Sequence, residues 1–173
     1  MGVQSTGTPE ARFRNVFAHL GAVTAYARRR GSSDADAIAA EVMTIAWRRL
    51  ADVPEDDPRP WLYATARNLV YSELRKAETA RRHQHELAEA PPAPEAFELD
   101  PQLGAALSGL SPLDREALLL TAWEELTPKE AARALGIKPT AFRVRLLRAR
   151  RRVEAKLAES TTAPDTKLTM ERT

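Results

Sequence analysis

The stretch TPKEAARALGIKPTAFRVRLLRARRRVEAKL, from Thr127 to Leu157, decides how the C-terminal part of the chain folds. Thr127 and Glu130 have the spacing of a capping box, in which each side chain satisfies a free backbone N–H of the other residue at a helix start. Gly136 can adopt the positive φ that ends a helix, and Lys138-Pro139 opens a second one. The stretch therefore predicts a helix-turn-helix.

The second of these helices has two different faces. At about 100° per residue, the residues that fall on one narrow apolar arc are Phe142, Leu146, Ala149 and Val153, and this arc is expected to pack inward together with Ala131, Ala132 and Leu135 of the first helix. The opposite face carries Thr140, Arg143, Val144, Leu147, Arg148 and Arg151.

This outward face is typical of a DNA-binding helix. A face that is merely solvated would mix in acids, and it would rarely place Val144 and Leu147 between arginines. A helix in the major groove uses arginines for guanine edges and phosphates, and apolar groups near thymine methyls. We therefore predict that this helix reads DNA. Arg145, Arg150 and Arg152 lie off the central face and are expected to contact phosphates or solvent.

The charge pattern divides the 173-residue chain into parts. Residues 12–83 carry thirteen basic and nine acidic residues, and residues 110–157 carry eleven basic and six acidic ones. Between them, residues 84–109 carry five acidic residues and no basic one. Two basic blocks joined by an acidic strip indicate two domains rather than one.

Cysteine is absent from the sequence, which excludes disulfides and thiolate metal sites and favours a reducing compartment. No signal-like apolar core begins the chain, and no stretch approaches the length of a membrane span. A cytoplasmic location is therefore expected. His19, His83 and His85 lack a second set of ligands, and no phosphate loop or acid–base constellation is found. We expect no metal, no cofactor and no enzymatic activity.

Helical spacing also dominates the N-terminal block. One apolar stripe closed by Gly31 comprises Phe13, Val16, Phe17, Leu20, Val23 and Ala27. A second helix is predicted from about Asp34 to Leu50, with Ile38, Val42, Ile45 and Ala46 inward. The segment ADVPEDDPRP, 51–60, breaks it, and a third helix should run from about Pro60 to Glu86. No alternating run predicts a sheet.

The expected architecture is all-α, with two small helical domains joined by a flexible acidic linker, and with the helix-turn-helix in the second domain. The predicted bounds are 10–86 for the first domain, 87–109 for the linker, 110–157 for the second domain and 158–173 for a disordered tail. Asp100-Pro101, Ser111-Pro112 and Thr127-Pro128 each pair a cap residue with proline and mark helix starts.

The N-terminal block resembles region 2 of bacterial sigma factors of the extracytoplasmic-function group. That group has a pattern like D-A-E-D-x-x-Q-E-x-F-x-x-A-W-x-x-L, followed by W-L-x-x-I-A-R-N-x-x-x-D-x-x-R. The residues that match it here are Asp34, Ala35, Glu41, Ala46, Trp47, Leu50, Trp61, Leu62, Ala66, Arg67, Asn68 and Arg75. The stretch from Leu110 to Val153 resembles region 4 of the same group. The resemblance covers about residues 10–157, and the ordered pair of regions is highly specific.

Some positions depart from the pattern of the group. Ala37 and Ala40 replace an acid and a glutamine, so the contact with the polymerase clamp is expected to be weaker or differently made. Ser72, followed by Glu73, replaces the second-pattern aspartate. In the recognition helix, Ala141 to Val144 replaces the common Thr-Val-Lys-Ser, so promoter preference should differ.

The resemblance implies an alternative sigma factor that binds the clamp and flap of core RNA polymerase, recognises the −10 and −35 promoter elements and promotes DNA melting. The exposed face of the second helix of the helix-turn-helix would read the −35 element. The residues implied at the −10 element are Trp61, Asn68, Tyr71, Arg75 and Lys76, and those implied at the clamp are Asp36, Glu41, Arg48 and Arg49. The linker would thread the RNA channel of the polymerase. An anti-sigma protein is implied as a regulator.

Two other functions fit part of the sequence. A conventional helix-turn-helix regulator would bind DNA without polymerase, usually at a two-fold symmetric site. A helical adaptor would bind acidic protein partners through its arginines. The matched Trp-Leu…Ala-Arg-Asn helix, with its own basic face, favours the sigma factor over both. From their helical spacing, several aromatic residues are interpreted as core rather than base-stacking groups: Tyr26, Trp47, Tyr63 and Trp123. Trp61 shares this spacing, but it borders the loop, where the resemblance implies a role at the −10 element.

Overall fold

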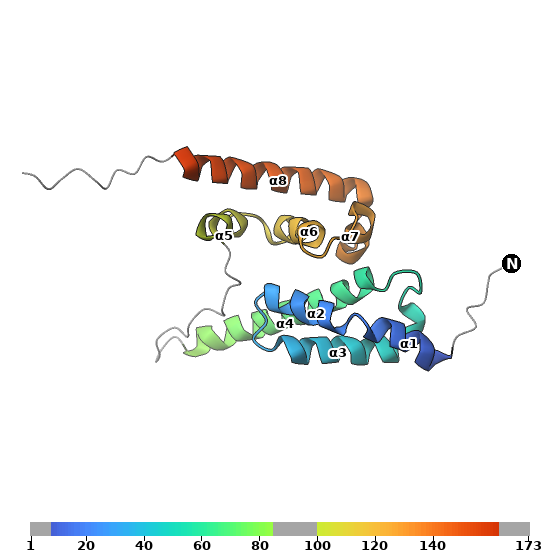
Figure 1. Cartoon of the computed structure of the whole chain (residues 1–173). Helices are drawn as coiled ribbons and strands as arrows, with labels where there is room; N and C mark the ends of the chain where they lie inside the picture. The colour runs from blue at the N-terminus through green and yellow to red at the C-terminus, as the bar shows by residue number, and fades with distance from the viewer. Residues whose placement is uncertain (1–7, 85–99, 163–173) are drawn as a thin grey trace, which may run out of the picture. The chain divides into compact units, whose positions relative to one another are not determined.

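The computed structural model describes residues 8–84 and 100–162, which are helical apart from short turns and contain no strand. The chain divides into two compact units, residues 1–97 and 98–173 (Figure 1). The all-α class predicted from the sequence is confirmed.

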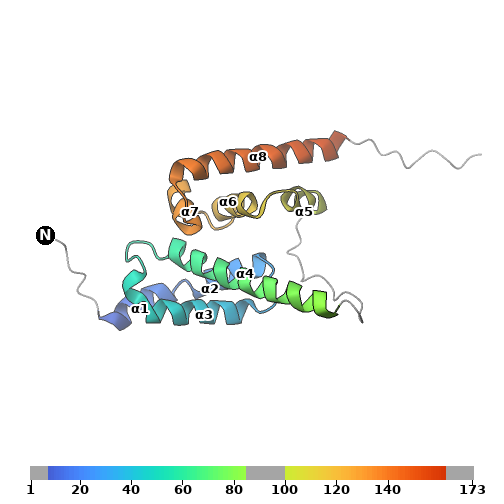
Figure 2. The same cartoon turned by 180° about the vertical axis from the view of Figure 1, so that it is seen from behind.

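The N-terminal unit contains α1 (Pro9–Phe17), α2 (Leu20–Arg29), α3 (Ala35–Arg48), the short 3-10 helix η1 (Leu50–Asp52) and the long α4 (Arg59–Gln84). Figures 1 and 2 show α2, α3 and α4 side by side. Their facing sides bury a core that includes Val23, Tyr26, Ala39, Val42, Ala46, Leu62, Ala66 and Val70.

The ends of these helices follow from local chemistry. The Asp34 carboxylate accepts a hydrogen bond from the Ala37 backbone N–H at 2.9 Å and so caps α3. Thr8 caps α1 in the same way, by accepting from the N–H of Ala11. Gly31 follows α2 with φ of 81°, the left-handed conformation expected of it.

The prediction of one continuous apolar stripe from Phe13 to Ala27 is wrong. The chain turns after Phe17, where the N–H of His19 donates to the carbonyl of Val16 and begins a new helix axis. This turn lets α1 pack across α3 while α2 packs against both α3 and α4. As a result Phe17 leaves the core and is 48% exposed.

The C-terminal unit contains α5 (Pro101–Ser108), α6 (Pro112–Ala122), α7 (Pro128–Leu135) and α8 (Pro139–Thr162). Side-chain oxygens of Asp100, Ser111 and Thr127 cap the first three helices, as their sequence pairing with proline predicts. α8 runs along α5, α6 and α7 (Figure 2). One core cluster joins α5, α6 and α8 and comprises Ala106, Leu107, Leu110, Leu119, Ala149 and Val153.

The structure moves two predicted boundaries. α5 lies inside the range 87–109 that was expected to be linker, and its Ala106 and Leu107 are buried in the C-terminal core. The helix start predicted at Asp100-Pro101 is confirmed, and it places the helix inside the range that was assigned to the linker. α8 continues past 157 to Thr162, because no breaker precedes Pro164. The rest of the predicted linker, 87–99, and the tail from 163 lie outside the described residues.

Candidate nucleic-acid and polymerase interfaces

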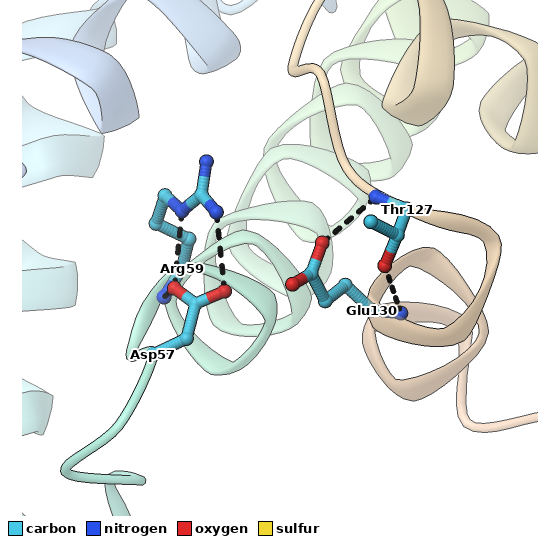
Figure 3. A network of polar contacts seen from close by, with 4 residues as sticks. All are labelled: Asp57, Arg59, Thr127 and Glu130. Atoms are coloured by element: carbon cyan, nitrogen blue, oxygen red, sulfur yellow. Dashed lines mark hydrogen bonds and ion pairs between the residues drawn. The ribbon is translucent and has the colours of Figure 1, made fainter.

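The helix-turn-helix is built by the capping box and the glycine turn that the sequence predicts. The N–H of Thr127 donates to Glu130 Oε2 at 2.7 Å, and the N–H of Glu130 donates to Thr127 Oγ1 at 3.4 Å (Figure 3). Gly136 adopts φ of 66° between α7 and α8. These contacts fix where α8 begins, and therefore which of its residues face outward.

The outward face of α8 carries the residues predicted to read DNA. All of them are exposed: Thr140, Arg143, Val144, Leu147, Arg148 and Arg151. Val144 and Leu147 are 52% and 50% exposed, so both apolar side chains are accessible to a partner. The predicted inner arc, Phe142 to Val153, is buried. α8 thus presents a stripe of arginines around two accessible apolar groups.

Two of the arginines expected to contact phosphate or solvent also form an ion pair within the unit. Arg145 Nη1 donates to Asp114 Oδ1 at 2.7 Å, and Arg152 Nη1 donates to Asp114 Oδ2 at 3.2 Å. Asp114 belongs to α6 and is only 8% exposed. Both arginines keep exposed area, 30% for Arg145 and 60% for Arg152, but they also have a partner on another helix, which spacing along α8 does not reveal.

The exposed face of α4 brings together the residues predicted at the −10 element. Asn68, Arg75 and Lys76 are exposed, while Trp61 and Tyr71 are half-buried. The opposite face of α4 is buried, including Leu62 and Ala66. Polar and aromatic groups therefore share one side of a helix that is held in place by its other side.

The loop before α4 is tied to α1 and to α4 by charged side chains. Arg12 of α1 donates from Nη2 to the carbonyl of Val53 at 2.6 Å and lies 3.3 Å from the Glu55 carboxylate. The Asp57 carboxylate accepts from the backbone N–H and from Nε and Nη2 of Arg59, at 3.1, 3.0 and 3.2 Å (Figure 3). Val53 is buried. The contact of Arg12 with Val53 therefore holds the start of the loop, and the contact of Asp57 with Arg59 holds its end.

Arg49 joins two of the predicted sites. Its Nε and Nη2 both lie 2.9 Å from Asp52 Oδ2, and its guanidinium carbon lies 5.9 Å from the centre of the Trp61 ring. A guanidinium at this distance from an indole face makes a weak cation–π contact. Arg49 was grouped with the polymerase-binding residues, but the structure places it beside Trp61 at the loop.

The other three residues predicted to bind polymerase lie on the exposed face of α3. Asp36, Glu41 and Arg48 are all exposed, and from 37 to 44 the other exposed side chains of the helix are the small ones of Ala37, Ala40 and Thr44. Small side chains with charged neighbours form a low surface against which another helix can lie closely.

The sequence interpretation missed an aromatic patch at the end of this face. We use the name aromatic patch for Phe13, Phe17 and Trp47. Trp47 was expected in the core, but it is 47% exposed. Its ring meets Phe13 edge to face with the centroids 5.1 Å apart, and Phe13 lies 6.0 Å from Phe17. The signal was present, because helical spacing places Trp47 on the same side as Asp36 and Ala40.

The burial of the other aromatic residues assigned to the core agrees better with that assignment. Tyr26 and Tyr63 are buried and stacked with their centroids 5.1 Å apart, so their assignment to the core is confirmed. Trp123 is half-buried against the C-terminal core cluster. Trp61 is half-buried beside the loop, so its ring keeps an accessible part.

Glu73 follows Ser72, the residue that replaces the aspartate of the family pattern. Its side chain links α4 to the turn before α3 by hydrogen bonds. Its carboxylate accepts from Ser32 Oγ at 2.6 Å, from the Ser33 backbone N–H at 2.8 Å and from Ser33 Oγ. Burial raises the pKa of Glu73, but the hydrogen bonds from Ser32, Ser33 and the backbone of Asp34 together outweigh it and leave the pKa below its ordinary value.

In residues 8–84 and 100–162, His and acidic side chains form no group of three or more able to hold a metal ion. Over the same ranges, no helix combines the length and the apolar character needed to span a bilayer.

A helix-turn-helix with a basic, partly apolar outer face, together with a second helical unit that has its own basic face, defines a DNA-binding protein of the transcription apparatus. The family description Sigma-70 region 2 matches residues 16–80, and Sigma-70, region 4 matches residues 101–153. The chain is 32% identical to the RNA polymerase sigma factor NccH of Alcaligenes xylosoxydans xylosoxydans over 142 residues, which cover 74% of this chain and 75% of that protein.

Two solved structures share the fold of this chain. The structure of CnrH in complex with the cytosolic domain of CnrY matches with a TM-score of 0.62 and 27% identity, over 89% of this chain and 92% of that one. The sigma factor RpoE from Bartonella quintana, solved with the anti-sigma factor NepR, matches in fold with a TM-score of 0.63 and 24% identity, over 84% of this chain and 95% of that one.

The chain belongs to the sigma-70 family, in the extracytoplasmic-function group. It is an alternative sigma factor for transcription initiation, and the family consists of non-enzymatic transcription factors that bind core RNA polymerase and promoter DNA. A conventional regulator or a helical adaptor would not be expected to match both regions in this order.

Proposed function

We propose that α8 reads the −35 element with its exposed face. Arg143 and Arg148 suit guanine edges or phosphates, and Val144 and Leu147 suit thymine methyl groups. The support is the exposure of these two apolar side chains between arginines, since nothing within the unit covers them. Thr140 and Arg151 at the two ends would contact the backbone and fix the register of the helix.

The exposed face of α4 is proposed to act at the −10 element. Melting requires groups that stabilise unstacked bases, and each stacked base is worth about 1–3 kcal/mol. Trp61 and Tyr71 supply aromatic faces, and Asn68 supplies an amide for a base edge. Arg75 and Lys76 follow one to two turns further along and suit the phosphates of the same strand.

The exposed face of α3 is proposed to dock on the polymerase clamp. Asp36, Glu41 and Arg48 would form its polar rim, and the small residues would allow a partner helix to approach closely. With alanine at 37 and 40, this contact is less polar than the family pattern, and the aromatic patch supplies apolar area beside it. Aromatic residues commonly carry a large part of the binding energy of interfaces.

A regulatory partner is a second proposal for the same surfaces. CnrH, at 27% identity and with nearly full coverage of both chains, was solved in complex with the cytosolic domain of another protein. A protein that covered the faces of α3 and α8 would compete with core polymerase and promoter. Competition is measured by titrating a candidate partner into a preformed holoenzyme and following release of labelled sigma factor. We place these events in the cytoplasm, where core polymerase acts.

The observation that carries the proposal is the pair of exposed basic faces, one on α4 and one on α8. The test is run-off transcription, with the purified protein and sigma-free core polymerase on a library of promoter fragments. New transcripts that share upstream motifs at two positions would support the assignment. DNA binding without polymerase binding, and without transcripts, would overturn it.

A further inference from the structure

Asp114 lies where the scaffold of the helix-turn-helix meets the recognition helix. It occupies the first turn of α6, where its backbone N–H donates to Ser111 Oγ at 3.2 Å, and its carboxylate turns toward α8. Its side chain is 11% exposed, whereas those of Arg145 and Arg152 are 30% and 60% exposed. One buried acid thus meets two arginines on the flank of the DNA-reading face.

The spacing of these arginines gives the contact a mechanical consequence. Arg145 and Arg152 are seven residues, or about two turns, apart on α8. A carboxylate that accepts from both turns opposes sliding of α8 along α6, and it also opposes rotation of α8 about its own axis. Since rotation would move Arg148 out of the groove, the contact bears on which base edges the helix can reach.

The contact also changes how much positive charge is available to DNA. α8 carries six arginines between 143 and 152, and two of them pair with the Asp114 carboxylate, which offsets part of their positive charge. Binding to phosphates without regard to sequence grows with each arginine that releases counterions. Specific binding depends instead on base contacts by the exposed face. Withholding two arginines therefore lowers non-specific affinity and leaves the reading face intact.

We propose that Asp114 is a positioning and specificity-determining residue for the −35 element: it holds α8 in register and keeps Arg145 and Arg152 from the phosphates. The inference rests on the proposed role of α8 in DNA reading. Asp114 would therefore act on DNA recognition indirectly, through Arg145, Arg152 and the position of α8.

The test compares wild-type protein with Asp114→Asn, which keeps the shape and removes the charge. Holoenzyme reconstituted with core polymerase is titrated onto two labelled duplexes at several salt concentrations. One is a promoter selected by run-off transcription, and the other has its −35 segment scrambled.

Each released arginine that reaches a phosphate steepens the slope of the logarithm of the binding constant against the logarithm of the salt concentration by about 0.9, so the variant should steepen this slope by up to about 1.8. Affinity for the scrambled duplex should rise several-fold, and the ratio of promoter to scrambled affinity should fall.

Glu125→Gln is the matched control, because it removes one negative charge from an exposed position of the same unit. It should leave the slope and the ratio unchanged. The triple variant Asp114→Asn, Arg145→Gln, Arg152→Gln should return the slope to the wild-type value. A merely structural role for Asp114 would lower both affinities together without steepening the slope.

Arg145→Gln and Arg152→Gln test the inference without altering Asp114. If the arginines are withheld from DNA, each single variant keeps the wild-type slope; a slope that falls by about 0.9 would overturn the inference. An unchanged slope in Asp114→Asn, with promoter preference retained, would also overturn it. Failure of the wild-type holoenzyme to distinguish the two duplexes would instead defeat the proposed function of α8.

Discussion

Phe13 of α1 meets Trp47 of α3 edge to face, with ring centroids 5.1 Å apart and ring planes at 72°. This contact fixes the indole on the outside of the N-terminal unit, where almost half of it remains exposed. An aromatic ring that is rigidly held and accessible loses little conformational entropy when a partner covers it. The aromatic patch is therefore well suited to protein binding.

Trp47→Ala should weaken binding to core polymerase by about 1–2 kcal/mol, roughly ten-fold in affinity, because it removes exposed aromatic area from the proposed clamp surface. Folding should suffer less, by about 1 kcal/mol, since the ring contributes mainly its contact with Phe13. Affinity is measured by fluorescence anisotropy of labelled protein titrated with core polymerase, and stability by thermal melting.

The matched control is Leu74→Ala on α4, which removes another exposed apolar side chain from the same unit. Polymerase affinity should not change in this variant. Equal losses of affinity in both variants, or a loss for Trp47→Ala that merely follows its melting temperature, would contradict the assignment of the aromatic patch.

Arg148→Ala should reduce promoter-specific initiation by about 1–3 kcal/mol and leave polymerase binding intact. Arg148 lies on the exposed face of α8, one turn from Val144, and Asp114 accepts hydrogen bonds from its neighbours Arg145 and Arg152 rather than from Arg148 itself. Initiation is measured by run-off transcription, and polymerase binding by the same anisotropy titration. Lys156→Ala is the control, because Lys156 points elsewhere and pairs with Glu159 at 3.3 Å. Equal loss of polymerase binding in Arg148→Ala would rule out a −35 role.

The helix-turn-helix could be predicted from the sequence almost in full. Its ends depend on local chemistry: Thr127 and Glu130 form the capping box, and Gly136 supplies the left-handed turn. Periodicity alone then assigned Phe142 to the core and Arg143 to the surface. Such features need no information from distant parts of the chain.

Other features depend on contacts between helices and could not be predicted. The turn after Phe17 carries no glycine or proline; it exists because α1 packs across α3. The pairing of Arg145 with Asp114 joins positions 31 residues apart. The position of Arg49 beside Trp61 likewise requires the fold of the intervening loop.

Arg12→Ala should impair DNA opening more than promoter binding. Arg12 anchors the loop before α4 through its 2.6 Å hydrogen bond to the Val53 carbonyl, and this loop leads to the −10 face. Loss of a charge-assisted bond at a half-buried site costs about 1–2 kcal/mol, which corresponds to a fall of roughly ten-fold in the opening rate if the loop must be ordered for melting. Permanganate reactivity of −10 thymines reports opening, and electrophoretic mobility reports promoter binding.

Arg14→Ala is the control for this prediction, since Arg14 is an exposed arginine on the same helix. It should open DNA at the wild-type rate. If the Arg12→Ala variant opens DNA at the wild-type rate while its stability falls, the contact between Arg12 and Val53 serves folding only, and the prediction is contradicted.

Glu73→Ala should lower the free energy of unfolding by about 1–2 kcal/mol at pH 7, because the carboxylate brackets Ser32 and Ser33. Those hydrogen bonds hold the pKa of Glu73 below its ordinary value of 4.5. A carboxyl whose pKa is lower in the folded state stabilises the fold fully above the unfolded-state pKa, and this stabilisation is lost as the pH falls through the folded-state pKa. The difference between wild type and variant should therefore be constant from about pH 6 to 8 and shrink below 4.5. Urea unfolding at a series of pH values measures this difference in the free energy of unfolding.

Glu78→Ala, which removes an exposed acid from the same helix, is the control and should show almost no difference from wild type at any pH. A difference for Glu73→Ala that stays constant through pH 3 would show that the carboxylate charge is not what holds the turn.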